Sequence, residues 1–398
     1  MKKILVIVLA VILALTLSLS SVTFAAGGKK EVELAQEVGQ AWVDSTVALT
    51  GEPAEWVGAH LTTPQVCYDL KGKPNAYTFA IENNGEVVGY MIVGSSAYGY
   101  PMFEAADVPA PAIPSADEVK SILASDLGLK VEKIGNPTRL LYLGFDNLYA
   151  VYQAGRQEVA VNLKFDFAVP ASNLTAAMPL PEDYKANKEA TTEAKPEQLE
   201  SSSSQSLVMP QGLVMLVAKY LTMSPYCGGG WCGPSSGVSI GQYYKTQVDR
   251  NGDGVKDYRL LPSSSNMYDR LNYYMSLRVG PVLPFQYGAG FVAMAMEAGY
   301  NNFDYDTDYI VTGGDYWNRV ADINSGWPIA LMSLQFNYPG RPSGGHWVAI
   351  RGYLFYQYSG EPIQTWIRCT DSYVCSDTVW IDWNNIGWGP TTVTIKDS

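Results

Sequence analysis

The sequence predicts an α+β protein made of two unequal parts, each combining helices with strands. Three observations support this fold class. Apolar residues recur with a helical period in some segments and alternate in others, and both patterns occur in each half of the chain. A polar, serine-rich stretch at 180–206 separates the halves. The length of 398 residues is sufficient for two or three hydrophobic cores.

The N-terminal 25 residues have the features of an export signal. Lys2 and Lys3 precede a long apolar run, and Thr23 and Ala25 occupy the small-residue positions of a cleavage site. We therefore expect a signal peptide at 1–25. The mature chain is expected to be secreted and extracellular, with no membrane attachment after cleavage.

Residues 26–179 predict a smaller α+β domain. Helical periodicity runs through 28–49, and Ser115 is a candidate N-cap for a second helix. Two strand-like runs flank Asn84-Gly85, a dipeptide typical of tight hairpins. Further strand-like runs cover 139–153 and 158–167.

The segment at 180–206 predicts a disordered linker, because it is charged and serine-rich and shows no apolar period. The second domain then covers 207–398. It contains four of the five cysteines of the chain.

The charge of the chain argues against one class of partner. Cleavage after Ala25 removes two lysines and no acidic residue, so the formal net charge changes from −12 to −14. Phosphate backbones repel such a protein, and no basic stripe offsets the acidic residues. We therefore expect no nucleic-acid partner.

The cysteine count leaves several pairings open. Because the number is odd, at least one thiol stays unpaired within an exported monomer. Cys369 and Cys375 are close enough in sequence to form a disulfide, and Cys227 is an alternative partner for either of them. The two remaining cysteines are Cys67, in the first domain, and Cys232, in the second.

Cys232 lies in the segment GGGWCGPSSGVSIGQYYK, residues 228–245, where a helix is expected to begin. Pro234 suits the first helical turn, since its missing N–H has no partner there in any case. The positive end of the helix dipole lowers the pKa of a thiol at this position. Cys232 is therefore a candidate nucleophile.

A cysteine nucleophile requires a base, and the chain contains only two histidines. His346 begins a strand-like run after two glycines, whereas His60 lies in the first domain without such a setting. Asp371 ends another strand-like run that can pair with the His346 strand, and it is the candidate to orient the imidazole. Asp382 is a rival, and Asn384 or Asn385 would also serve chemically.

These residues resemble those of papain-like cysteine peptidases, in particular the bacterial branch related to double-glycine leader (bacteriocin-processing) peptidases. The matching segments are CGPSS at 232–236, INSGWPIALM at 323–332, GGHWVAIRGY at 344–353 and CTDS at 369–372. The resemblance implies that a helix bearing the nucleophile packs on an antiparallel sheet, with the active cleft between them. Such enzymes carry a glutamine about six residues before the cysteine, where this chain has Tyr226. Tyr226, or a backbone N–H of 228–230, is the expected oxyanion donor.

The resemblance implies a secreted cysteine peptidase with a Cys232, His346 and Asp371 triad, acting on peptide or protein substrates. The domain at 26–179 would be a pro-domain and intramolecular inhibitor, so the chain would be a zymogen activated by cleavage in the linker. The same triad also serves cell-wall amidases and acyl or γ-glutamyl transferases. A third alternative is a binding module without catalysis.

A second motif, DRNGDGVKD, has the oxygen-ligand spacing of a calcium loop. The ligands would be the side chains of Asp249, Asn251, Asp253 and Asp257 and the carbonyl of Val255. Leu260 replaces the bidentate glutamate of a sensor site, which predicts weak, structural binding. We expect Ca²⁺ at this loop and no organic cofactor.

Overall fold

The computed structural model describes most of the chain from Glu31 onwards. The described ranges are 31–176, 178–196, 213–229, 231–275, 282–310, 315–334, 345–358, 362–386 and 391–397. The predicted signal peptide and the part of the predicted linker after residue 196 lie outside them. Among the described helices, none combines the length and the hydropathy needed to cross a bilayer.

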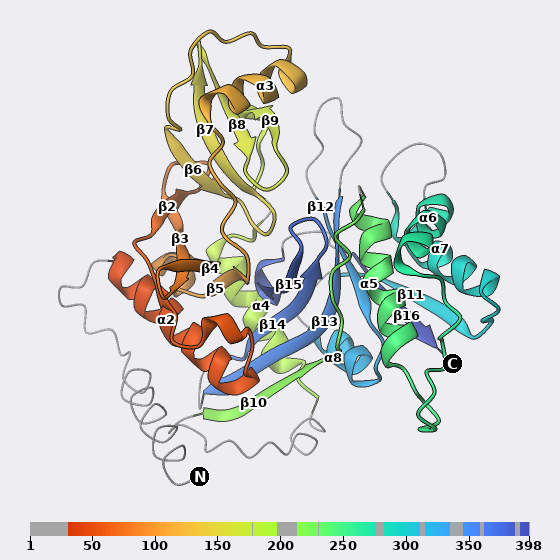
Figure 1. Ribbon diagram of the computed structural model, residues 1–398. Coiled ribbons are helices and arrows are strands. Elements are labelled where there is room, and N and C mark those ends of the chain that lie inside the picture. Colours follow the sequence, from red (N-terminus) through yellow and green to blue (C-terminus); the bar gives the residue numbers. More distant parts are fainter. Residues whose placement is uncertain are drawn as a thin grey trace.

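The prediction of an α+β fold is confirmed: helices surround a large, mostly antiparallel sheet (Figure 1). The helices before residue 197 are α2 (Glu31–Thr50), α3 (Ala116–Leu127) and α4 (Pro181–Glu193). The strands there are β1 (His60–Leu61), β2 (Gln65–Tyr68), β3 (Pro74–Asn83), β4 (Glu86–Gly94), β5 (Met102–Ala106), β6 (Arg139–Tyr142), β7 (Leu148–Ala154), β8 (Gln157–Asn162) and β9 (Phe167–Pro170).

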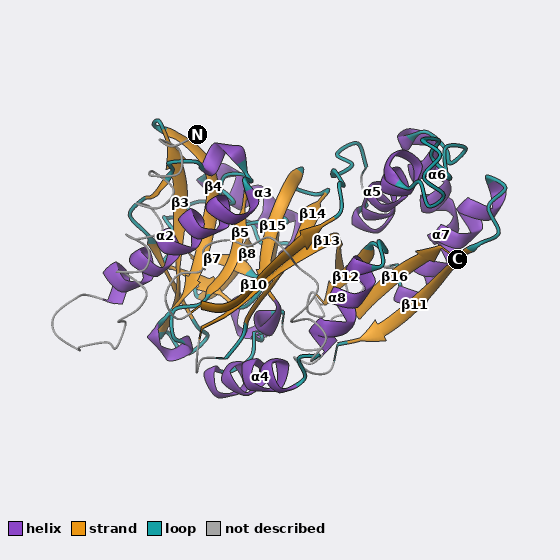
Figure 2. Cartoon of the chain, turned by 90° about the horizontal axis from the view of Figure 1, so that it is seen from below, coloured by secondary structure: helices purple, strands orange, loops and turns teal. Residues whose placement is uncertain are grey.

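The second half adds four helices and further strands to the described structure. The helices are α5 (Cys232–Gln247), α6 (Ser264–Met275), α7 (Pro284–Glu297) and α8 (Tyr316–Asn324). The strands are β10 (Leu213–Tyr220), β11 (Phe303–Tyr309), β12 (Ile329–Leu334), β13 (Gly345–Tyr358), β14 (Gln364–Asp371), β15 (Ser376–Asp382) and β16 (Thr391–Asp397). Figure 2 shows α5, α6 and α7 on one side of the C-terminal strands and α8 on the other.

Local sequence signals account for several of these elements. Asn84 and Gly85 both have positive φ, 52° and 83°, and form the two-residue turn between β3 and β4. Ser115 caps α3: its Oγ accepts from the Glu118 backbone N–H, and Glu118 Oε2 accepts from the Ser115 N–H at 2.7 Å. The predicted hairpin and the predicted second helix are therefore confirmed.

A single sheet runs through both halves of the chain. Its order is β11-β16-β12-β13-β14-β15-β5-β4-β3-β2-β6-β7-β8-β9, with β10 on β13 and β1 on β3. The pairing of β2 with β6 is parallel, and the other pairings are antiparallel. The halves join where β15 pairs with β5, with Trp380 opposite Ala105. Backbone hydrogen bonds therefore link the two predicted domains directly.

A shared apolar core reinforces this junction. Trp42 of α2 makes edge-on ring contacts with Trp366 and Trp380, at centroid distances of 6.0 Å and 6.1 Å. All three side chains are buried. Arg368 of β14 also pairs with Glu52, which follows α2, at 2.6 Å. Both halves thus supply side chains to the same hydrophobic cluster.

The prediction of a disordered linker starting at residue 180 is wrong for 181–193, which form α4. This helix is held by hydrogen bonds and by the buried ring of Tyr184, which packs edge-on against Tyr98 and Phe103. The buried Tyr184 hydroxyl donates to Asp382 Oδ2 at 2.6 Å, and Thr191 Oγ1 bonds Asn384 Oδ1 at 3.1 Å. Trp317 Nε1 donates to the Thr191 carbonyl at 2.7 Å. Only Tyr184 and Thr191 of this helix are buried, so its sequence shows no apolar stripe.

Candidate active site

The first residue of α5 is Cys232, as the sequence predicted. Trp231 before it is extended, and the Trp231 carbonyl accepts the first-turn hydrogen bond from Ser235 N–H at 3.1 Å. Cys232 is partly exposed and is not one of the two cysteines joined by the disulfide of the described residues. At Gly241 a Cβ would lie 2.3 Å from Met267 Sδ, so glycine allows α6 to pack closely against α5. The helix is thereby held with Cys232 at its N-terminal end, next to β13.

His346 and Asp371 come from neighbouring strands. β13 carries His346 near its start, and β14 ends at Asp371 after pairing with β13 in the antiparallel sense. His346 Nε2 lies 3.0 Å from Asp371 Oδ1, and both side chains are almost completely buried. A hydrogen bond also joins the Cys232 side chain to His346. The structure therefore brings the three predicted residues together in the order thiol, imidazole, carboxylate.

The electrostatic environment favours the charged form of both buried partners. Burial lowers the pKa of His346, but Asp371, Asp146 and the hydrogen bond to Cys232 outweigh burial and raise this pKa to about 10. Burial opposes ionisation of Asp371, yet His346 and Lys164 hold its pKa well below the usual range. The site therefore favours an imidazolium next to a carboxylate, the arrangement that stabilises a thiolate.

Two charged residues that sequence reasoning missed, Lys164 and Asp146, lie next to Asp371 and His346. Lys164, in the turn after β8, places Nζ 2.8 Å from Asp371 Oδ2 and 2.5 Å from Asp146 Oδ1. Asp146 lies in the turn between β6 and β7. Both side chains are buried. No sequence signal pointed to them, because a lysine after a strand-like run in the first half has no motif that links it to His346.

Aromatic rings cover the imidazole. Phe165, next to Lys164, lies with its ring centroid 5.1 Å from that of His346 and 4.9 Å from that of Tyr373. Tyr373 follows β14 and is half exposed. In the α5–α7 region, the buried Tyr287 hydroxyl bonds Ser236 Oγ at 3.0 Å. Phe165 thus brings the N-terminal half into contact with the imidazole of His346.

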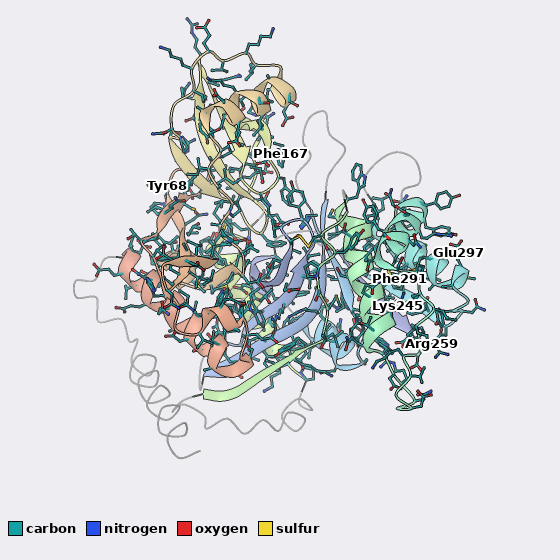
Figure 3. The ribbon with its side chains drawn as sticks, viewed as in Figure 1. Tyr68, Phe167, Lys245, Arg259, Phe291 and Glu297 are labelled. Carbon is teal, nitrogen blue, oxygen red and sulfur yellow. A yellow bond between two sulfur atoms is a disulfide. The ribbon has the colours of Figure 1, made fainter. Side chains whose placement is uncertain are left out.

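The segment before α5 is tied to the turn between β14 and β15. Cys227 and Cys375 form a disulfide, drawn in yellow in Figure 3. Cys369 is free and buried, so the alternative that pairs Cys369 with Cys375 is wrong. Tyr226 donates its backbone N–H to Ser372 Oγ at 3.2 Å, and its ring packs against Tyr268. Its role as an oxyanion donor stays a prediction.

The rivals of Asp371 have other partners. Asp382 accepts from Tyr184, and burial, which outweighs that bond, raises its pKa to about 6. Asn385 Nδ2 donates to the Tyr142 hydroxyl at 3.1 Å. Asn384 bonds Thr365 and Thr191. His60 lies on β1 with a mostly exposed side chain, so neither it nor these rivals joins the group around His346.

The acidic loop after α5 has the turn geometry that its glycines predicted. Asp249 accepts from the N–H groups of Gly252 and Gly254, both at 2.9 Å, and these glycines have φ of 71° and 82°. Asp257 Oδ2 accepts from the Arg250 N–H at 2.6 Å. Calcium binding by this loop stays a prediction.

Metal-ligand geometry within the described residues was found at another place. The one group of three His, Cys, Asp or Glu side chains there with donor atoms within 4.8 Å of one another is Asp146, His346 and Asp371. The Lys164 ammonium already lies at ion-pair distance from both carboxylates of this group. These three residues therefore fit a charge network better than a metal site.

Comparison of the sequence with protein-family models gave no match, and comparison with curated proteins gave none. The function is therefore argued from the geometry of the site.

Proposed function

We propose that the chain is an exported cysteine peptidase with a papain-like catalytic region at 207–398 and a Cys232, His346 and Asp371 triad. The observation that carries the proposal is the contact of His346 Nε2 with Asp371 Oδ1 at 3.0 Å, together with the hydrogen bond from His346 to a partly exposed thiol at a helix N-terminus. A disulfide in the same region supports an oxidising compartment.

The chemistry follows from the charges. The Cys232 thiolate attacks the substrate carbonyl carbon, and the peptide C–N bond breaks as the His346 imidazolium gives its proton to the leaving amine. His346 then takes a proton from water, which attacks the thioester and releases the acid. Asp371 keeps the imidazole oriented through both steps. Each step uses only groups of this chain and one water molecule.

The proposal also concerns latency. The ring contact between Phe165 and His346 supports control of the site by the N-terminal half. The pairing of β5 with β15 supports continued attachment of that half after a cut in the linker. We propose that cleavage within 197–206 relieves latency without dissociating residues 26–179 from the catalytic region.

The test is hydrolysis of a mixed peptide library by purified chain. Cys232→Ala and His346→Ala are expected to abolish cleavage, whereas Cys67→Ala, which changes a buried free thiol on β2, keeps it. An epoxysuccinyl probe should label the wild type at Cys232 alone. Digestion of peptidoglycan but not of peptides would favour an amidase. Failure of the probe to react would favour a binding module.

A further inference from the structure

The buried ion pairs of Lys164 reach the triad from the other half of the chain. Asp371 uses both of its oxygens: Oδ1 contacts His346 Nε2 and accepts from the Tyr373 backbone N–H at 2.9 Å, while Oδ2 pairs with Lys164 Nζ. A carboxylate held at both oxygens has one orientation available. Lys164 therefore fixes the group that in turn orients His346.

The residues at the end of β8 hold Lys164 next to Asp146, which lies in the turn between β6 and β7. The Asn162 side chain is fully buried, and its amide donates to the Asp146 carbonyl at 3.0 Å. Its Oδ1 accepts from the backbone N–H groups of Lys164 and Phe165, at 2.9 Å and 3.0 Å. One asparagine thus joins the two turns that carry the charges, which is preorganisation of the kind found around functional groups.

We propose that Lys164 is a positioning residue of the site, which holds the Asp371 carboxylate and, together with Asp146, sets the charge balance at His346. The inference rests on the proposed function for its catalytic meaning. It makes the N-terminal half a permanent component of the active site.

The charge balance predicts the sign of each perturbation. With His346 protonated, the two cations Lys164 and His346 balance the carboxylates of Asp146 and Asp371. Removing the ammonium leaves one excess negative charge, which makes the imidazolium harder to deprotonate. Removing the Asp146 charge leaves one excess positive charge, which has the opposite effect. Asp146 and His346 have donor atoms within 4.8 Å of one another. With an effective dielectric constant of about 20, a unit charge at that range shifts the pKa of His346 by the order of one pH unit or more.

Other titratable groups face this cluster, and one of them titrates close to neutrality. Burial raises the pKa of Glu104 to about 7, although Lys164 opposes this. The remaining groups are Tyr90, Tyr142, Asp166, Cys232, Arg351, Cys369 and Tyr373. The pKa of His346 measured in a Glu104→Gln background is free of the titration of Glu104.

The chain offers a direct readout, because it contains only two histidines. In full-length His60→Gln protein, His346 is the single histidine, and NMR of the labelled ring reports its pKa without any substrate. Lys164→Met should raise that pKa and Asp146→Asn should lower it. The double variant should return it close to the wild-type value, and Lys164→Arg should leave it unchanged.

Activity supplies the second readout. In Lys164→Met, kcat should fall by about tenfold or more with KM little changed, because the carboxylate loses its fixed orientation. Lys130→Met changes an exposed lysine of the same half and is the matched control. If neither the wild type nor any variant hydrolyses peptides but the NMR shifts occur, the proposed function fails and the charge network stands.

The proposal is overturned if Lys164→Met leaves the pKa of His346 unchanged, or if it shifts this pKa in the same direction as Asp146→Asn. Should Lys164→Met not fold, the comparison of Asp146→Asn with the charge-balanced double variant decides. A double variant that keeps the full shift of Asp146→Asn would overturn the inference.

Discussion

The junction between the halves predicts that a cut chain stays in one piece. A specific protease site placed within 199–205 would allow the linker to be cleaved in the folded protein. The β5–β15 pairing and the cluster around Trp42, Trp366 and Trp380 should then hold the two fragments together. Release of the first fragment would instead require that ladder and the shared apolar cluster to be broken.

The contribution of this junction to the association of the cut fragments can be calculated for Trp380. Its side chain is 0% exposed, and it packs between Trp42 and the guanidinium of Arg368. Truncation of a buried tryptophan to alanine costs about 3–5 kcal/mol. Since each 1.4 kcal/mol is tenfold in affinity, Trp380→Ala should weaken association of the cut fragments by roughly 100-fold to 3,000-fold.

Size-exclusion chromatography at decreasing concentration measures this effect. The cut wild type should elute as one species at micromolar concentration, and the cut Trp380→Ala variant should separate into two. Trp231→Ala removes a tryptophan that is 67% exposed and should behave as the wild type. Separation of the wild-type fragments at micromolar concentration would refute the reasoning and support a releasable pro-domain.

Three further predictions concern stability. The pKa of His346 is raised from 6.5 to about 10, so its contribution to stability is complete below about pH 6.5 and is lost as the pH rises through 10. The difference in Tm between the wild type and Asp371→Asn should therefore be largest near pH 6 and shrink towards pH 10; a constant difference would contradict this. Cys375→Ser opens a loop closed over a sequence separation of 148 and should lower the free energy of unfolding by about 2–5 kcal/mol in denaturant titrations, whereas no change would show that the disulfide does not form in solution. Calcium at about 100 times its Kd should add about 2.7 kcal/mol to the stability of the wild type but not to Asp249→Ala with Asp253→Ala; a Tm unaffected by chelator in the wild type would show that the loop binds no calcium.

The sequence correctly predicted the elements that depend on residues close together in the chain. The Asn84-Gly85 turn and the Ser115 cap depend on residues a few positions apart, and both formed as expected. The start of α5 at Cys232 and the strand that begins near His346 belong to the same class. Helix α4 does not belong to this class, because Tyr184 and Thr191 dock it through contacts with residues far away in the sequence.

Cys232, His346 and Asp371 could be chosen as candidates from the sequence, because each stands at or near the end of a helix or strand and has distinctive neighbours. Asp371 was preferred to Asp382 because its strand-like run can pair with the His346 strand. Both residues end or follow such runs, however, and only the sheet register places Asp371 next to His346. The pairing of Cys227 with Cys375 depends in the same way on where the turn after β14 lies.

By itself, the sequence determined the α+β class, the helices α2, α3 and α5 and the Asn84-Gly85 hairpin, and it singled out Cys232 and His346 as candidate site residues. These follow from periodicity, capping and turn preferences, which act over a few residues. Tertiary structure alone decided that the sheet is continuous from β15 to β5 and that Lys164 lies against Asp371. The physical reason is that strand pairing and buried ion pairs depend on positions far apart in the chain, and their energy exists only once both surfaces are folded and water is excluded.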